Sequence, residues 1–216
     1  MSDMNPKALH KAQLRLRVAS KTAADLKDCK TYGDFSDAWY IFLHAAKGIY
    51  TMLEQGSKPT PQGRQWFGGK NQERKDDPLL RYVTEARNDD EHGIEPITEY
   101  APATLALGVK TPTSSGKMID EYGNVFMNCG TAYRVTGASG PVKVPQLRSL
   151  DGKPIENRFT PPTARLINVR DRAGRVYTPP RSHLGVSIEP TPPIVADLMV
   201  KYLTGLLAEA WGFCKP

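Results

Sequence analysis

The sequence predicts a mainly α-helical fold with a β insertion, an α+β protein built on a four-helix bundle. Apolar residues recur at helical spacing in residues 1–97 and again in 191–212. Between these regions, residues 98–190 consist of short strand-like runs broken by turn residues. The last apolar stretch is too wide to be left in water, so its simplest partner is the N-terminal helical region. We therefore assign helices 1–3 to 1–97, a β insert to 98–190, and the fourth helix with the C-terminus to 191–216.

The first two helices have recognisable ends. Asn5 is a good N-cap and Pro6 suits the first helical position. Asp34 is the expected cap of the second helix, and Gly56 is its expected stop. The inward residues are Leu9, Leu16, Ala19, Ala23 and Leu26 in the first helix, and Phe35, Trp39, Phe42, Ala46, Ile49 and Leu53 in the second.

A loop rich in proline, glycine and charge is expected over residues 57–77. The third helix then begins at Asp77-Pro78 and turns Leu79, Leu80, Val83 and Ala86 inward. Gly93 can take the left-handed conformation that ends a helix. The fourth helix is capped by Thr191 and has Pro192 and Pro193 in its first turn.

The insert reads as an antiparallel hairpin or meander. Residues 120–126 and 171–177 share the pattern Asp-x-x-Gly-x-Val-aromatic, in which glycine supplies positive φ at a hairpin corner. The sequence Leu-Asp-Gly-Lys-Pro at 150–154 is a third turn signal. Proline-rich flanks favour irregular, exposed connections around the strands.

The net charge of +6 lies entirely in the second half of the chain. Residues 1–100 contain 15 Lys/Arg and 15 Asp/Glu, whereas residues 101–216 contain 14 and 8. Such a basic region can contact phosphates, and Arg170, Arg172 and Arg175 are its candidate nucleic-acid-binding residues. The alternative is a solvated basic surface on a β-rich insert.

Several function classes lack their sequence signals. No run of 18 apolar residues and no secretory leader occurs, so neither a membrane span nor secretion is expected. Cys29, Cys129 and Cys214 are odd in number and far apart, which indicates reduced thiols in a cytoplasm and no zinc site. Walker, dinucleotide-binding, nucleophile-elbow and HExxH motifs are missing, and no cofactor is expected.

A short constellation at the end of the third helix carries candidate chemistry. The sequence there is Arg87-Asn88-Asp89-Asp90-Glu91-His92. RNA is cut when a 2′-hydroxyl attacks the neighbouring phosphorus, which requires proton transfer and neutralisation of the phosphorane. Histidine is the side chain whose unperturbed pKa lies near neutrality, and arginine offers a permanently charged fork for phosphate oxygens. Asn88 can bond the phosphate or hold His92.

An Arg-Asn-x-x-x-His motif on the third helix of a four-helix bundle resembles the HEPN superfamily. The resemblance covers the motif and the helical layout, residues 1–97 and 191–213, but not the β insert. The stretch 77–96 is also similar to one found in uncharacterised bacterial proteins. The resemblance implies metal-independent RNA cleavage of toxin or defence type by Arg87, Asn88 and His92. It also implies a 2′,3′-cyclic phosphate product and a homodimer in which two motifs line one cleft.

Geometry and charge leave alternatives open. On an ideal helix Arg87 and His92 point about 140° apart, so they share a site only if the helix ends or a second copy supplies the missing groups. The neighbouring carboxylates repel phosphate, and they favour a protonated imidazole, which suits a general acid. The bland interpretation is a helix end where Arg87 pairs with Glu91 and His92 is a cationic cap. A third is a non-catalytic site for RNA or a protein partner such as an antitoxin.

Other candidates are weaker. His10, His44 and His183 are isolated, and surface or capping roles are expected for them. Trp66 and Phe67 lie in the glycine-flanked stretch 63–69, which is expected to plug the bundle end. The alternative for this stretch is a lid or a base-stacking platform near the motif.

Overall fold

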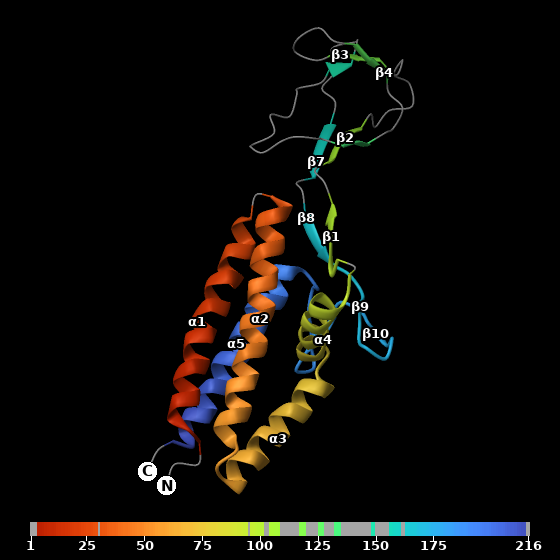
Figure 1. The fold of residues 1–216 in the computed structure, drawn as a ribbon. Helices are drawn as coiled ribbons and strands as arrows, with labels where there is room; N and C mark the ends of the chain where they lie inside the picture. Colours follow the sequence, from red (N-terminus) through yellow and green to blue (C-terminus); the bar gives the residue numbers. More distant parts are fainter. Residues whose placement is uncertain are drawn as a thin grey trace. The chain divides into compact units, whose positions relative to one another are not determined.

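The computed structural model describes residues 4–29, 31–94, 96–101, 104–108, 117–119, 125–127, 132–134, 148–149, 156–160 and 163–214. The chain forms two compact units, Met1–Glu99 with Arg165–Pro216, and Tyr100–Ala164. The described residues are mainly helical and carry small antiparallel strand pairs (Figure 1). The predicted class, mainly α with a β insertion, is therefore confirmed.

Three long helices form the centre of the helical unit. These are α1 (Pro6–Asp28), α2 (Tyr32–Ser57) and α5 (Pro192–Gly212), which pack side by side (Figure 1). Asn5 caps α1 as predicted, but Thr31 rather than Asp34 caps α2, and Thr191 makes no side-chain capping bond. The buried core includes Leu9, Leu16, Trp39, Phe42, Ile49, Leu53, Met199 and Leu203.

The expected loop over 57–77 is wrong in its central part, because Pro61–Asp76 forms helix α3. The Thr60 hydroxyl accepts a hydrogen bond from Gly63 N at 3.1 Å, and Pro61 takes the first helical position. Contacts with α5 hold this helix, since Trp66 Nε1 donates to Glu209 Oε2 at 3.3 Å. The described part of the chain thus contains five helices rather than four, with four of them before the strands.

Helix α4 (Pro78–His92) and four short strands complete the helical unit. Strands β9 (Val169–Arg170) and β10 (Val176–Tyr177) form one antiparallel hairpin, and β11 (Ser182–His183) and β12 (Val186–Ser187) form another. Gly174 has a φ of +78°, which confirms the predicted glycine corner in 171–177. Both hairpins pack against α4, so α4 is the element around which the candidate site is built.

The remaining strands pair mostly over long sequence separations. They are β1 (Thr98–Ala101), β2 (Thr104–Gly108), β3 (Lys117–Ile119), β4 (Val125–Met127), β5 (Ala132–Arg134), β6 (Arg148–Ser149), β7 (Glu156–Thr160) and β8 (Thr163–Leu166). The sheet orders are β1-β8, β5-β2-β7 and β4-β3-β6. The pairs of β2 and β3 are antiparallel, as predicted, but β2 pairs with β5 and β7 rather than with β3, unlike a meander. The turns at 120–124 and 150–154 lie outside the described residues.

The compact strand unit is shorter than the predicted insert of 98–190, because residues 165–190 belong to the helical unit. Leu166 and Val169 are buried, and Tyr82 Oη on α4 donates a hydrogen bond to the Ile167 carbonyl at 2.7 Å. Proline-rich segments precede and follow the β11–β12 hairpin in the sequence, within residues 178–193. Pro180 is buried, although these segments were expected to be exposed. Apolar anchors therefore attach this part of the chain to α4.

Two further predictions concern the bilayer and the cysteines. None of the helices in the described part is both long and apolar enough to cross a membrane. Cys29 and Cys214 are free thiols, while Cys129 lies outside the described residues. Cys214 Sγ lies 3.5 Å from the Met4 carbonyl, which places the two ends of the helical unit together.

Candidate functional site

Helix α4 presents the motif at its C-terminal end. Asp77 caps the helix as predicted, and the apolar side of the helix, including Leu80 and Ala86, is buried. Gly93 follows His92 and has an extended φ of −86°, so the predicted left-handed ending is wrong. Glycine is needed here for space, because a Cβ at Gly93 would lie 2.6 Å from the Asp89 carbonyl oxygen.

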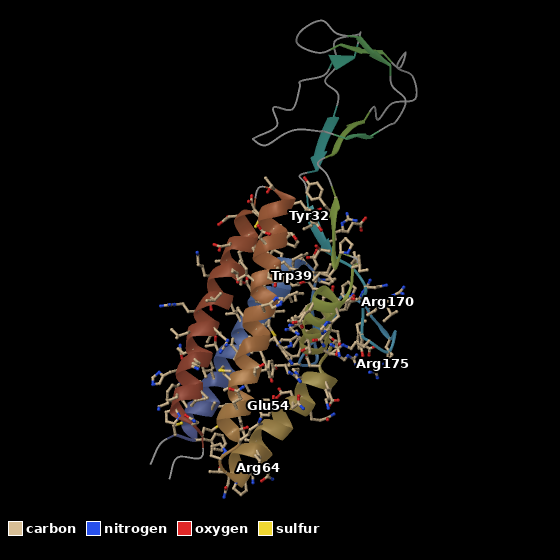
Figure 2. All side chains as sticks on the ribbon, viewed as in Figure 1. Tyr32, Trp39, Glu54, Arg64, Arg170 and Arg175 are labelled. Carbon is tan, nitrogen blue, oxygen red and sulfur yellow. The ribbon has the colours of Figure 1, made fainter. Side chains whose placement is uncertain are left out.

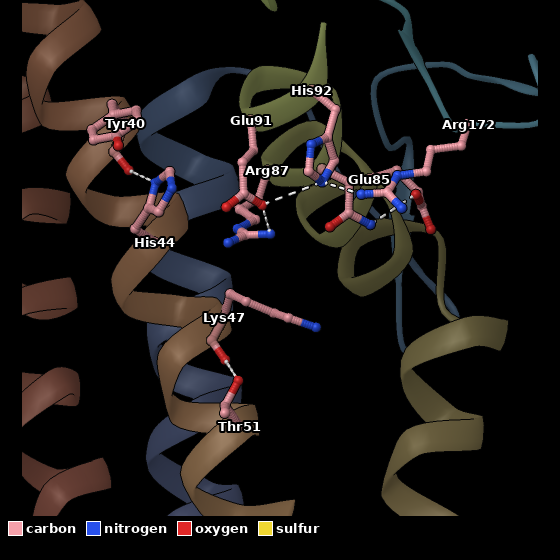
Figure 3. Close-up of polar contacts among 10 residues, drawn as sticks. Tyr40, His44, Lys47, Thr51, Glu85, Arg87, Glu91, His92 and Arg172 are labelled. Carbon is pink, nitrogen blue, oxygen red and sulfur yellow. Dashed lines mark hydrogen bonds and ion pairs between the residues drawn. The ribbon is translucent and has the colours of Figure 1, made fainter.

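Arg87 and His92 converge on one oxygen atom, Oε2 of Glu91. Arg87 Nη1 forms an ion pair with this oxygen, and His92 Nε2 lies 3.5 Å from it (Figure 3). Glu91 lies four residues after Arg87, the spacing at which side chains on a helix meet. The two motif side chains therefore reach a common anion within one chain although they start from different sides of the helix.

Asn88 does not hold His92. Its Nδ2 donates to Oε2 of Glu85 at 3.2 Å, one turn earlier on α4. Arg87 is mostly covered, with 19% of its side chain exposed, whereas 41% of the His92 side chain is exposed. Arg87 Nε is buried and has no hydrogen-bond partner among the described residues. The site is thus an exposed imidazole beside a largely covered guanidinium.

The β9–β10 hairpin brings the predicted basic residues to the same place. Arg172 Nη2 lies 2.6 Å from His92 Nε2, and Arg170 N donates to Asp89 Oδ2 at 2.8 Å. Arg175 Nε is bonded to Asp171 Oδ2 at 2.6 Å, so its charge is partly neutralised. Arg170 and Arg175 lie on this hairpin beside α4 (Figure 2). Tertiary structure therefore joins two groups of candidates that are about 80 residues apart in sequence.

The Asp171 carboxylate organises the turn of this hairpin. It accepts hydrogen bonds from Ala173 N and Arg175 N, both at 2.9 Å, and from Tyr177 Oη at 3.0 Å. Arg81 of α4 lies over the Tyr177 ring, 5.5 Å from its centroid. A fixed turn against α4 keeps the Arg172 backbone near the end of the helix.

Lys47 and Arg74 are two cations that were not predicted from the sequence, and Arg74 bonds Asn71 Oδ1 at 2.6 Å and lies over the Tyr50 ring. Lys47 extends from α2 toward α4, below Arg87 (Figure 3). Burial lowers the pKa of the Lys47 ammonium, and the nearby guanidinium groups of Arg74 and Arg87 lower it further. Neither Lys47 nor Arg74 has a carboxylate within ion-pair distance among the described residues. A lysine interrupting the apolar stripe of α2 is the signal that could have identified this cluster.

His44 and Asp90 lie on the α2 side of the motif. His44 Nδ1 is 3.0 Å from the Tyr40 carbonyl oxygen, within its own helix. Burial raises the pKa of the Asp90 carboxyl, against the opposite effects of His44 and Arg87, and Asp89 adds to the increase. Cationic and anionic side chains therefore lie close together at the motif. A phosphate must compete with these carboxylates for the cationic groups.

The other predicted candidates have structural contacts. His10 packs edge-on against Trp211, with ring centroids 5.1 Å apart. His183 is buried and its Nδ1 lies 3.1 Å from Asp77 Oδ1. Trp66 packs against Phe213 at the end of α5, with ring centroids 5.6 Å apart, as expected for a plug at the bundle end. Among the described residues, none of these groups shares a hydrogen bond, ion pair or ring contact with Arg87, Asn88 or His92.

Comparison of the chain with protein-family models, with curated proteins and with solved structures gave no match. The resemblance to the HEPN superfamily accordingly rests on the residues Arg87, Asn88 and His92, because the structure places them on the fourth of five described helices rather than on the third of four. It stays a prediction. What the site can do chemically follows from its own groups: three cationic or protonatable side chains, Arg87, His92 and Arg172, can face one anion.

Proposed function

We propose that this chain is a metal-independent endoribonuclease of HEPN type, and that it holds a phosphodiester of RNA at the C-terminal end of α4. One observation carries this proposal. Arg87 Nη1 and His92 Nε2 meet at the single oxygen Glu91 Oε2, and the Arg172 guanidinium lies beside the same imidazole nitrogen. We infer that Glu91 Oε2 occupies a place that a phosphate oxygen takes when RNA displaces the carboxylate.

The chemistry divides among these side chains. The ribose 2′-oxygen attacks phosphorus, the bond from phosphorus to the 5′-oxygen breaks, and a 2′,3′-cyclic phosphate and a 5′-hydroxyl result. Arg172 can only donate, so Nε2 of His92 is the acceptor in the contact seen here. When the phosphate takes over Arg172, His92 takes up a proton and, as an imidazolium, gives it to the departing 5′-oxygen. Arg87 and Arg172 neutralise the negative charge that develops on the phosphorane oxygens. The 2′-hydroxyl proton passes to a base, for which we propose the neutral imidazole of His92 of the partner subunit in a homodimer.

The surrounding charges support binding of a polyanion. Lys47 and Arg74 add two cations that lack carboxylate partners among the described residues, on α2 and α3. Arg170 extends the basic surface along the hairpin. Cations distributed over three helices and a hairpin match a chain of phosphates better than a single small anion.

A second function is favoured by a specific contact. The Arg87–Glu91 ion pair and the low exposure of Arg87 fit a helix end that is neutralised internally. In that case the chain is a non-enzymatic interaction protein, and the basic hairpin binds RNA or an acidic partner such as an antitoxin. The two functions differ in whether RNA is cut, and binding of RNA by itself is compatible with both.

Cleavage of single-stranded RNA in EDTA separates the two functions. We expect the wild type to cut RNA and leave cyclic-phosphate ends, and His92→Ala to be slower by at least about 100-fold. His10→Ala is the matched control, since it removes an exposed histidine on α1, and we expect it to cut normally. If the wild type and both variants leave RNA intact while all three fold, the enzyme is excluded and the binding function remains.

Charge reversal of the hairpin tests the basic surface separately. We expect Arg170→Glu with Arg172→Glu to weaken RNA binding and to lower the salt dependence of log affinity by about 0.7 per lost phosphate contact. Arg64→Glu with Lys58→Glu is the matched control, because both residues are exposed and lie where α2 ends and α3 begins, whereas the hairpin packs against α4. Equal loss in both double variants would mean that only net charge matters.

A further inference from the structure

A cavity of about 470 Å³ lies between α3, α5 and the β11–β12 hairpin. Its lining is mainly aliphatic and includes Leu184, Val186 and Leu198, with Tyr202 and His183. None of Arg87, Asn88, His92 or the hairpin arginines contributes to it. Concave, mostly apolar cavities of 300–1,000 Å³ with a few fixed polar groups are typical small-molecule sites.

His183 supplies a fixed polar group to this cavity. It is 9% exposed, and its Nδ1 faces Asp77 Oδ1 at 3.1 Å. Asp77 also accepts hydrogen bonds from Leu80 N and Leu184 N, at 2.9 and 2.6 Å, so its carboxylate is held in place. An ionised carboxylate only accepts, so Nδ1 carries a proton, and this contact selects the Nδ1–H tautomer of the imidazole. The lone pair is then on Nε2, which none of the described residues bonds.

The hairpin turn that borders the cavity is strained. Leu184 has a φ of +47° and Gly185 a φ of +79°, the two positive values that tight hairpin turns use. Glycine or asparagine is favoured at such positions, and leucine is unfavourable there. Leu184 nevertheless lines the cavity and is 56% exposed. Strain held in place by surrounding structure is a feature of functional sites.

Gly205 keeps the α5 wall of the cavity open. It lies within a 21-residue helix, where glycine is less favourable than alanine. A Cβ at this position would meet no heavy atom within 4 Å, so no packing contact requires glycine. The missing side chain instead leaves room in the cavity that Gly205 lines.

The charges at the rim balance. Two lysines, Lys70 and Lys201, and two glutamates, Glu73 and Glu209, are among the lining residues. Lys70 Nζ already pairs with Glu73 at 3.3 Å and with Glu209 at 2.9 Å. A charged ligand would find no excess of opposite charge there.

We propose that this cavity binds a small, uncharged, mainly apolar molecule that donates one hydrogen bond to Nε2 of His183. The aliphatic lining takes the apolar body, and the imidazole selects for the hydroxyl or N–H group. The lining of this cavity includes none of the motif residues at the C-terminal end of α4, so the proposal stands or falls independently of RNA cleavage.

Two fluorescent probes that differ in one donor test this site. 2-Naphthol is neutral and donates one O–H bond, whereas 2-methoxynaphthalene has the same apolar body and no donor. We expect the wild type to bind 2-naphthol about tenfold more tightly, the value of one hydrogen bond of about 1.4 kcal/mol. We expect Gly205→Phe, which fills the cavity, to lose both probes. Gly68→Phe is the matched control, because Gly68 is an exposed helical glycine with open space around it.

A further variant separates an effect on ligand binding from an effect on the stability of the fold. Leu184→Gly relieves the positive φ and keeps the turn, so we expect a fold at least as stable as the wild type with weaker binding of 2-naphthol. Absence of binding by either probe, equal affinity for both, or unchanged affinity in Gly205→Phe would each overturn the proposal. Tighter binding of 2-naphthoate than of 2-naphthol would also overturn it, since the site would then select an anion.

Discussion

The two ends of α4 carry the same pair of groups in opposite surroundings. At the N-terminal end, Asp77 and His183 are 3.1 Å apart and less than 10% exposed. At the C-terminal end, Glu91 and His92 are 3.5 Å apart and about 40% exposed. Each histidine also lies beside a hairpin that packs on α4. The difference teaches that burial, not residue type, decides whether a carboxylate–imidazole pair fixes the fold or stays open to solvent and ligands.

The largest expected effect is at the buried end. Asp77→Ala removes the cap of α4 and leaves Leu184 N and His183 without their acceptor. We expect the free energy of unfolding, measured by urea denaturation at pH 7, to fall by about 3 kcal/mol. Asp76→Ala is the control, since Asp76 is exposed, and should change it by less than about 0.5 kcal/mol. Similar losses in both variants would break the comparison.

The next largest effect is the difference in stability between variants of the two histidines, His183 and His92. His183→Ala opens a cavity and leaves Asp77 without its imidazole partner, so we expect a loss of about 2 kcal/mol in the free energy of unfolding. His92→Ala removes an exposed side chain and should cost less than about 0.5 kcal/mol. Thermal and urea unfolding of the two variants in parallel measure this contrast. A larger loss at His92 would mean that the exposed end is structural.

Lowering the pH should destabilise the fold through Asp77, at the buried N-terminal end of α4. Burial alone would raise the pKa of the Asp77 carboxyl, but hydrogen bonds from Leu184 N, Leu80 N and His183 outweigh it and hold the pKa below its usual value. Asp77 therefore stabilises the fold above the unfolded pKa of about 3.9, and this stabilisation is lost as pH falls through the lower folded pKa. We expect Asp77→Asn to flatten the loss of stability that the wild type shows as the pH falls below about 3.9. Parallel curves for both proteins would contradict this.

A small gain in stability, opposite in sign to the losses above, is expected at Lys47, beside the exposed end. Because its pKa is lowered, the charged ammonium is disfavoured in the fold at pH values below the folded pKa. Lys47→Met should therefore raise the free energy of unfolding at pH 7, by less than about 1 kcal/mol because solvent screens a half-exposed group. RNA binding should weaken at the same time, with a salt slope lower by up to about 0.7. If Lys47→Met stabilises the fold but binds RNA as tightly as the wild type, Lys47 does not belong to the RNA site.

Much of the helical architecture could be predicted from local signals. Asn5-Pro6 and Asp77-Pro78 mark helix starts, and apolar spacing identifies the buried faces of α1, α2, α4 and α5. Helix α3 was missed because its glycines and low hydropathy resemble a loop. Its stability depends on Trp66 and Lys70 reaching Glu209, more than 130 residues later in the chain. Such contacts have no local sequence signal.

The candidate site was predicted only in part. Arg87, Glu91 and His92 lie on one helix, so their mutual reach follows from helical spacing. Arg172 was expected to contact nucleic acid, but its place beside His92 depends on how the β9–β10 hairpin packs on α4. A surface or capping role was expected for His183, but the residue is buried because the hairpin turn places it against Asp77, the N-cap of α4.

The sequence by itself determined where helices begin, which of their faces are apolar, and that a basic segment follows a neutral one. Periodicity and capping are local, so they survive without knowledge of the fold. Only the tertiary structure decided which imidazole is buried, which guanidinium meets His92, and where glycine leaves a cavity. Those outcomes depend on long-range packing, which sets burial and charge environment, and a linear pattern of residues does not contain it.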